Sequence, residues 1–100
     1  MDNAICLHNA TVLTGFSVME HCAVYIKDNK IADVFNESRF LHKQFNPKVN
    51  IINVNGAYIA PGFIDTHIHG IGGCGTDDNT AASILKMSEI LASYGVTSFF

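Results

Sequence analysis

The stretch Phe63-Ile64-Asp65-Thr66-His67-Ile68-His69 decides the fold prediction for this chain. It is predicted to be a strand with both faces occupied. A glycine-rich loop follows over residues 70–76, a helix is expected over about residues 80–93, and Val96–Phe100 begins another strand. A strand, a helix and a second strand in this order form a βαβ unit, which implies a parallel sheet.

The helix prediction rests on its ends and on its apolar periodicity. Asp78 or Asn79 is expected to cap the N-terminus, and Gly95 suits the position just after the C-terminus. Apolar residues recur at spacings of three and four, which predicts one stripe that packs in a core. The stripe consists of Ile84, Met87, Leu91 and Tyr94.

Residues 1–60 predict an antiparallel β segment. Residues 23–27 and 30–34 flank Asp28-Asn29, two residues that tolerate positive φ, and this pattern predicts a hairpin. Further strands are expected over residues 5–13 and 49–54, with a loop or a short helix around residues 38–44. The chain is therefore predicted to have two parts, residues 1–60 and residues 61–100.

Composition narrows the class of protein. Apolar residues make up 48% of the 100 residues and charged residues 15%, which excludes a largely disordered chain. The net charge is −3 and the six Lys and Arg residues form no basic stripe, so no nucleic-acid partner is expected. The sequence has neither a signal-peptide pattern nor an apolar run long enough for a membrane span, and a cytoplasmic protein is expected.

The three cysteines are odd in number and far apart in the sequence. No C-x-x-C pair occurs, so reduced thiols are expected rather than a disulfide. Cys6 and Cys22 lie in apolar strands and are predicted to be core residues. Cys74 lies in the glycine-rich loop and is predicted to be an ordinary free thiol.

Asp65, His67 and His69 carry the candidate chemistry. Alternate residues of a strand point to the same side, so both imidazoles are expected to project together at the carboxyl end of the strand, where parallel α/β folds place their sites. Two neutral imidazoles can bind one zinc-like ion, and Asp65 could orient a ligand from behind. An H-x-H pair alone is weak evidence, since five histidines in 100 residues give a chance pair on the order of one time in four. His8, His21 and His42 stand singly and are predicted to be surface or edge residues.

The segment Ala60–Gly70 resembles the first barrel strand of the amidohydrolase superfamily, whose members carry a P-G-(aromatic or apolar)-I-D-x-H-x-H pattern. Within that superfamily, Gly70–Asp78 and Tyr94–Phe99 look most like the N-acetylglucosamine-6-phosphate deacetylase family. The resemblance is specific over residues 58–100 and generic over residues 1–55.

The resemblance implies an α/β fold: N-terminal strands of a small β-sandwich (residues 1–60), followed by the first βαβ unit of a (β/α)₈ barrel (residues 61–100) that is incomplete in this chain. It implies that His67 and His69 are metal ligands, with zinc the first choice and iron or another divalent ion the alternative. The implied substrate is an amino-sugar phosphate whose acetamide is hydrolysed by a homo-oligomeric enzyme. No residue in these 100 matches the family's remaining ligands or its catalytic Asp, so the isolated chain is expected to be inactive and poorly stable.

Two other interpretations stay open at this point. One keeps the superfamily and changes the substrate, to that of an isoaspartyl dipeptidase or of a dihydroorotase or hydantoinase, which share the same first strand. The other is a non-catalytic module that associates with itself through its open sheet edges.

Overall fold

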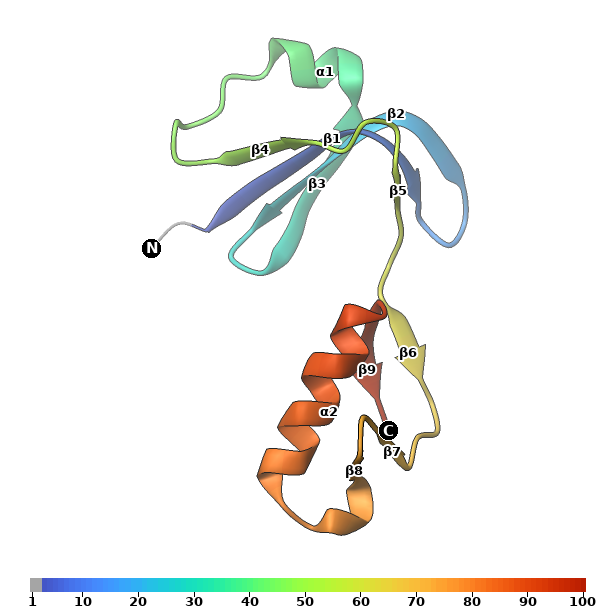
Figure 1. Ribbon diagram of the computed structural model, residues 1–100. Coiled ribbons are helices and arrows are strands. Elements are labelled where there is room, and N and C mark those ends of the chain that lie inside the picture. Colours follow the sequence, from blue (N-terminus) through green and yellow to red (C-terminus); the bar gives the residue numbers. More distant parts are fainter. Residues whose placement is uncertain (1–2) are drawn as a thin grey trace. The chain divides into compact units, whose positions relative to one another are not determined.

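A computed structural model describes residues 3–100. The chain divides into two compact units, of which the first ends at Pro61 and the second begins at Gly62 (Figure 1). No helix in the described part of the chain is long and apolar enough to cross a membrane.

The first unit is built on one mixed five-stranded sheet of order β3-β2-β1-β4, with β5 also paired to β1. Its strands are β1 (Ala4–Leu13), β2 (Val18–Lys27), β3 (Lys30–Asn36), β4 (Asn50–Asn53) and β5 (Tyr58–Ile59).

The prediction of a purely antiparallel segment is wrong for β4 and β5. β1, β2 and β3 pair antiparallel, but β4 and β5 both run parallel to β1. The reason is the connection: after β3 the chain passes through helix α1 (Glu37–His42) and the loop that follows it before it pairs again. A crossover of that length allows a parallel return, which a tight hairpin cannot provide.

Two short local predictions in the first unit are confirmed. Asp28 and Asn29 have φ values of 52° and 63° and join β2 to β3, with Lys27 opposite Lys30. The short helix expected near residues 38–44 is α1, which begins one residue earlier because the side chain of Asn36 caps it, with Oδ1 accepting a hydrogen bond from the amide of Arg39 at 2.8 Å.

The buried core of the first unit lies on both sides of the sheet. Cys22 packs in a cluster with Ala10, Val12 and Val24, and Cys6 packs in another with Ala23 and Phe35. Burial, and secondly the negative charge of Glu37, raise the pKa of both thiols above the ordinary cysteine value. The prediction that both cysteines are core residues is confirmed.

His8 is a correction to the sequence-based expectation of a surface or edge residue. Its Nδ1 lies 2.7 Å from Oε1 of Glu37, and its ring stacks on Phe40 with the centroids 4.0 Å apart. The other carboxylate oxygen of Glu37 accepts a hydrogen bond from the amide of Asn9 at 3.0 Å. A half-buried histidine therefore fastens α1 to β1, a pairing of residues 29 positions apart that no local pattern reveals.

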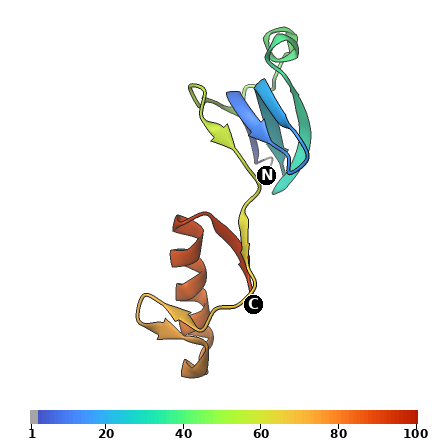
Figure 2. The same ribbon diagram turned by 90° about the vertical axis from the view of Figure 1, so that its right-hand side faces the viewer.

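The second unit consists of β6 (Phe63–Asp65), helix α2 (Ala81–Ser93) and β9 (Val96–Phe99), with β6 and β9 paired in parallel (Figures 1 and 2). Between β6 and α2 lie a small antiparallel pair, β7 (Gly70–Ile71) and β8 (Cys74–Gly75), and a 3₁₀ turn, Thr76–Asp78. The segment expected to be a glycine-rich loop thus contains a hairpin, whose turn residues Gly72 and Gly73 have φ values of 62° and 80°.

Helix α2 differs from its prediction in the residue that caps its N-terminus and in how much of its apolar stripe is buried. Thr80 is the cap, because its Oγ1 accepts a hydrogen bond from the amide of Ser83 at 3.2 Å, whereas Asn79 has a left-handed φ of 57°. Gly95 follows the helix with a φ of 85°, as predicted. Met87 and Leu91 are buried, but Ile84 is 37% and Tyr94 74% exposed, so only the middle of the stripe packs in this unit.

Candidate metal centre

The two histidines of the H-x-H pair converge just beyond the end of β6. Nε2 of His67 lies 3.0 Å from Nε2 of His69, and the two rings meet edge to face with their centroids 4.7 Å apart. Both residues are exposed. The sequence therefore predicted correctly that the two imidazoles lie side by side.

The strand itself is shorter than predicted, because its regular pairing ends at Asp65 rather than His69. Phe100 is the residue that pairs next: its amide donates to the carbonyl of Asp65 at 3.0 Å, and its carbonyl accepts from the amide of Ile68 at 3.2 Å. These two bonds hold the backbone that carries the histidines beside β9. The pair thus lies at the carboxyl end of two parallel strands.

Asp65 supports the pair through the backbone. Its Oδ1 accepts a hydrogen bond from the amide of His67 at 3.1 Å, with no hydrogen bond to an imidazole ring. The carboxylate therefore fixes the main chain at His67. Its predicted role of orienting a metal ligand stays a prediction.

Gly70, which directly follows His69, lies at a close contact between two strands. A Cβ atom at Gly70 would lie 2.4 Å from the carbonyl oxygen of Cys74, in the facing strand of the β7–β8 hairpin. The missing side chain allows this close approach of the two strands, which follow directly after His69.

The two imidazole nitrogens at this end of the strands match two of the four ligand positions of a tetrahedral zinc ion. Two ligand nitrogens on a tetrahedral zinc ion, each about 2.0–2.1 Å from it, lie roughly 3.3 Å apart, close to the separation of the two Nε2 atoms. Within residues 3–100, no third His, Cys, Asp or Glu side chain joins them in a metal-binding group. The spacing of the two histidines fits two positions around a divalent ion, and no further side chain among residues 3–100 completes that set.

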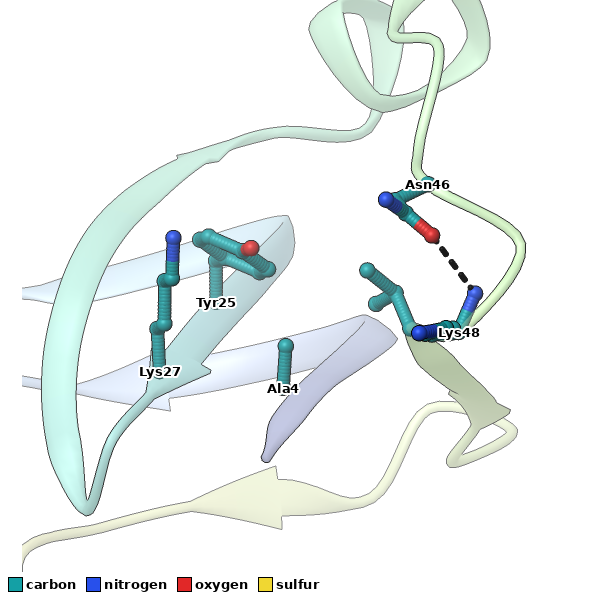
Figure 3. A pocket seen from close by; sticks show the side chains of 6 residues that line it. Ala4, Tyr25, Lys27, Asn46 and Lys48 are labelled. Carbon is teal, nitrogen blue, oxygen red and sulfur yellow. Dashed lines mark hydrogen bonds between the residues drawn. The ribbon is translucent and has the colours of Figure 1, made fainter. Parts of the chain in front are cut away.

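Two of the hollows in the first unit were weighed against this site. One, of about 70 Å³, is lined by residues that include Tyr25, Lys27 and Lys48, and its wall is closed by a hydrogen bond from the Lys48 amide to Asn46 Oδ1 (Figure 3). That volume is far below the roughly 300 Å³ of small ligand pockets. The other, of about 250 Å³, is lined almost wholly by apolar side chains such as Val12, Ile31 and Ile59, which offer no group for catalysis.

Comparisons with known proteins show what this chain is similar to. No family model matches the chain. It is 31% identical over 96 residues to the N-acetylglucosamine-6-phosphate deacetylase of Lysinibacillus sphaericus, an alignment that covers 96% of this chain and 23% of that protein. It is 40% identical over 50 residues to the putative amidohydrolase YtcJ of Bacillus subtilis (strain 168), covering 50% of this chain and 10% of that one.

Among solved structures, a mutant N-acetyl-D-glucosamine-6-phosphate deacetylase from Mycobacterium smegmatis, in complex with N-acetyl-D-glucosamine-6-phosphate, superposes with a TM-score of 0.73. The match has 23% identity and covers 98% of this chain and 23% of that one. The predicted resemblance to the amidohydrolases is confirmed. The chain spans about a quarter of the length of the deacetylases it matches.

Sequence reasoning missed the hydrogen bonds that hold the segment after His69. The amide of Thr76 donates to the carbonyl of His69 at 2.8 Å, and the amide of Gly75 donates to Oδ2 of Asp78 at 2.9 Å. Asp78 was predicted, with Asn79 as the alternative, to cap the helix that Thr80 caps in the structure. The Gly-Gly pair at residues 72–73, a typical hairpin turn, was the signal that could have revealed this arrangement.

Proposed function

We propose that this chain is part of a metal-dependent amidohydrolase and that His67 and His69 are two of its metal ligands. The observation that carries the proposal is the 3.0 Å separation of the two Nε2 atoms at the carboxyl end of a parallel strand pair. Neutral imidazole is a common ligand of zinc and of other divalent ions, and a site with open positions is what hydrolytic chemistry requires.

Each residue of the segment then has a defined task. His67 and His69 hold the ion, Asp65 fixes the main chain of His67, and Gly70 allows the β7–β8 hairpin to close beside His69. A divalent ion bound there supplies Lewis-acid chemistry, polarising an amide carbonyl and lowering the pKa of water to about 7. On this proposal no residue of the chain is given the task of moving the proton, because Asp65, the carboxylate beside the pair, is engaged with the main chain of His67.

We infer that the substrate is N-acetylglucosamine 6-phosphate and the products glucosamine 6-phosphate and acetate. The support is the alignment with the Lysinibacillus sphaericus deacetylase over 96% of this chain, together with the Gly70–Asp78 segment. On this proposal residues 61–100 begin a (β/α)₈ barrel and residues 1–60 form part of a small β-sandwich. The complete protein is a cytoplasmic homo-oligomer that uses zinc, with iron as the alternative.

The experiment is a substrate panel with the complete gene product. Acetate release from N-acetylglucosamine 6-phosphate is compared with turnover of dihydroorotate, of a hydantoin and of a β-aspartyl dipeptide, each with the protein as purified and after treatment with a chelator. We expect acetate release that the chelator abolishes. A strong rate on one of the other amides without acetate release would keep the metal site and replace the substrate. Turnover of none of them would favour the non-catalytic module.

A further inference from the structure

Asp78 joins the segment that follows His69 to the first turn of helix α2. Its Oδ2 accepts a hydrogen bond from the amide of Gly75 at 2.9 Å and another from the hydroxyl of Ser83 at 3.0 Å. These two donors, the Gly75 amide first and the Ser83 hydroxyl second, hold the pKa of the Asp78 carboxyl below its ordinary value. The carboxylate is therefore charged at neutral pH and fully able to accept both bonds.

Gly75 lies beside the backbone of His69. It pairs with Gly70 in the β7–β8 hairpin, and the next residue, Thr76, donates its amide to the carbonyl of His69 at 2.8 Å. A Cβ atom at Gly75 would lie 3.4 Å from that same carbonyl oxygen. The main chain of His69 is thus held by a segment whose own position depends on Asp78.

The tip of the hairpin also rests on the helix. A Cβ atom at Gly72 would lie 2.3 Å from Cδ1 of Ile90, so this side of the turn lies against α2. The hairpin is fixed to α2 at two places, by packing at its tip and by the Asp78 carboxylate at its base. Of the two places, the base is the one next to Thr76 and His69.

We propose that Asp78 is a positioning residue that sets the orientation of His69, and through it the geometry of the metal pair, by tying Gly75 to Ser83. The inference rests on the proposed function only in calling His69 a metal ligand. The tie is indirect and exposed to solvent, so the expected effect is smaller than the tenfold to hundredfold typical of residues that bond a metal ligand directly.

The test compares three variants of the complete gene product. Asp78→Ala removes both hydrogen bonds, and Asp78→Asn keeps an oxygen acceptor without the charge. Asp77→Ala is the matched control, because the Asp77 carboxylate also lies beside Gly75, with Oδ1 2.6 Å from where a Cβ atom would be, but is assigned no hydrogen bond there. The zinc dissociation constant is measured by competition with a chromophoric chelator, with the melting temperature of the metal-free protein as a check on folding. We expect Asp78→Ala to raise the constant about threefold to tenfold, Asp78→Asn to restore most of the affinity, and Asp77→Ala to change it less than twofold.

A second measurement does not depend on metal. Hydrogen–deuterium exchange of the metal-free protein reports on the Thr76 amide, which should exchange several-fold faster in Asp78→Ala and at the wild-type rate in Asp77→Ala. Equal effects of Asp78→Ala and Asp77→Ala on both readouts would overturn the inference. If the wild type binds no zinc, the proposed metal site fails; the Thr76 exchange then decides by itself whether Asp78 positions His69.

Discussion

The two units of this chain differ in how many apolar residues they bury and in where the candidate metal ligands lie. Of the ten buried apolar residues in the described chain, eight lie in the first unit and two, Met87 and Leu91, lie in the second. The candidate metal ligands His67 and His69 belong to the second unit, and both are exposed. The first unit fills its own core, whereas the second presents its chemistry to solvent on a scaffold with little core of its own.

This difference indicates which interactions stabilise each unit. In the first unit, buried side chains on both faces of a five-stranded sheet supply the hydrophobic stabilisation. In the second, backbone hydrogen bonds and close glycine contacts carry more of the organisation, as at Gly70 and Gly72. Large apolar side chains such as Phe63, Leu85 and Tyr94 stay mostly exposed there. Substitutions in the two units should therefore differ in how they affect metal binding and the free energy of unfolding.

The largest expected effect is loss of metal without loss of fold. In the complete gene product, His67→Ala or His69→Ala should remove about one equivalent of tightly bound metal, because each supplies one of the two nitrogens at this site. The exposed rings leave no core cavity, so the melting temperature of the metal-free protein should hardly change. Elemental analysis checks this, with the exposed His42→Ala as the control. An unchanged metal content in both variants would mean that the pair is structural.

The next effect concerns stability and should differ between the units. Phe35, 2% exposed, belongs to a core cluster, and Phe35→Ala should cost about 3–5 kcal/mol of unfolding free energy. Met87 is fully buried, but Leu91 is the one other buried residue of its unit, so Met87→Ala should fall near the lower end of about 2–5 kcal/mol. Amide exchange of β1–β2 and of α2 would measure each unit separately. A greater loss from Met87→Ala than from Phe35→Ala would contradict the comparison.

A smaller effect tests the glycine contacts of the second unit. Gly72→Ala and Gly73→Ala both place a Cβ at positive φ, which costs about 1–2 kcal/mol. Gly72→Ala should cost about 1 kcal/mol more, because its Cβ would displace Cδ1 of Ile90 from its rotamer, whereas the space at Gly73 is open. In an Ile90→Val background, which lacks that atom, the two substitutions should become equal. A difference that survives there would place the extra cost elsewhere.

The smallest perturbation leaves the fold and the candidate site intact and compares the reaction rates of the three thiols. At pH 8, Cys74 should react with a disulfide reagent on the order of tenfold or more faster than Cys6 and Cys22, because those two are buried and burial raises the pKa of their thiols, which lowers the reactive thiolate fraction. Cys74→Ser should remove the fast phase alone, and denaturant should make all the thiols reactive. A fast phase in the Cys74→Ser variant would show that the first unit opens more readily than its packing implies.

Much of this chain could be predicted from short-range pattern. The hairpin at Asp28-Asn29, the buried Cys6 and Cys22, and the glycine after α2 follow from turn chemistry, apolar runs and capping preferences that act over a few residues. The convergence of His67 and His69 was also predicted, from the alternation of side chains along a strand, although β6 ends at Asp65 and the two histidines lie just beyond it.

What only the tertiary structure decided depends on partners distant in the sequence. The parallel pairing of β4 with β1, the His8–Glu37 contact and the pairing of β6 with β9 each join residues between 29 and 45 positions apart. Asp78 is different: its two hydrogen bonds reach only three and five residues away, so the signal was local and was missed. A local sequence pattern indicates which interactions a residue can make. Which distant partner it meets depends on the entropic cost of closing the loop between them and on how the two segments pack, and a short stretch of sequence contains neither.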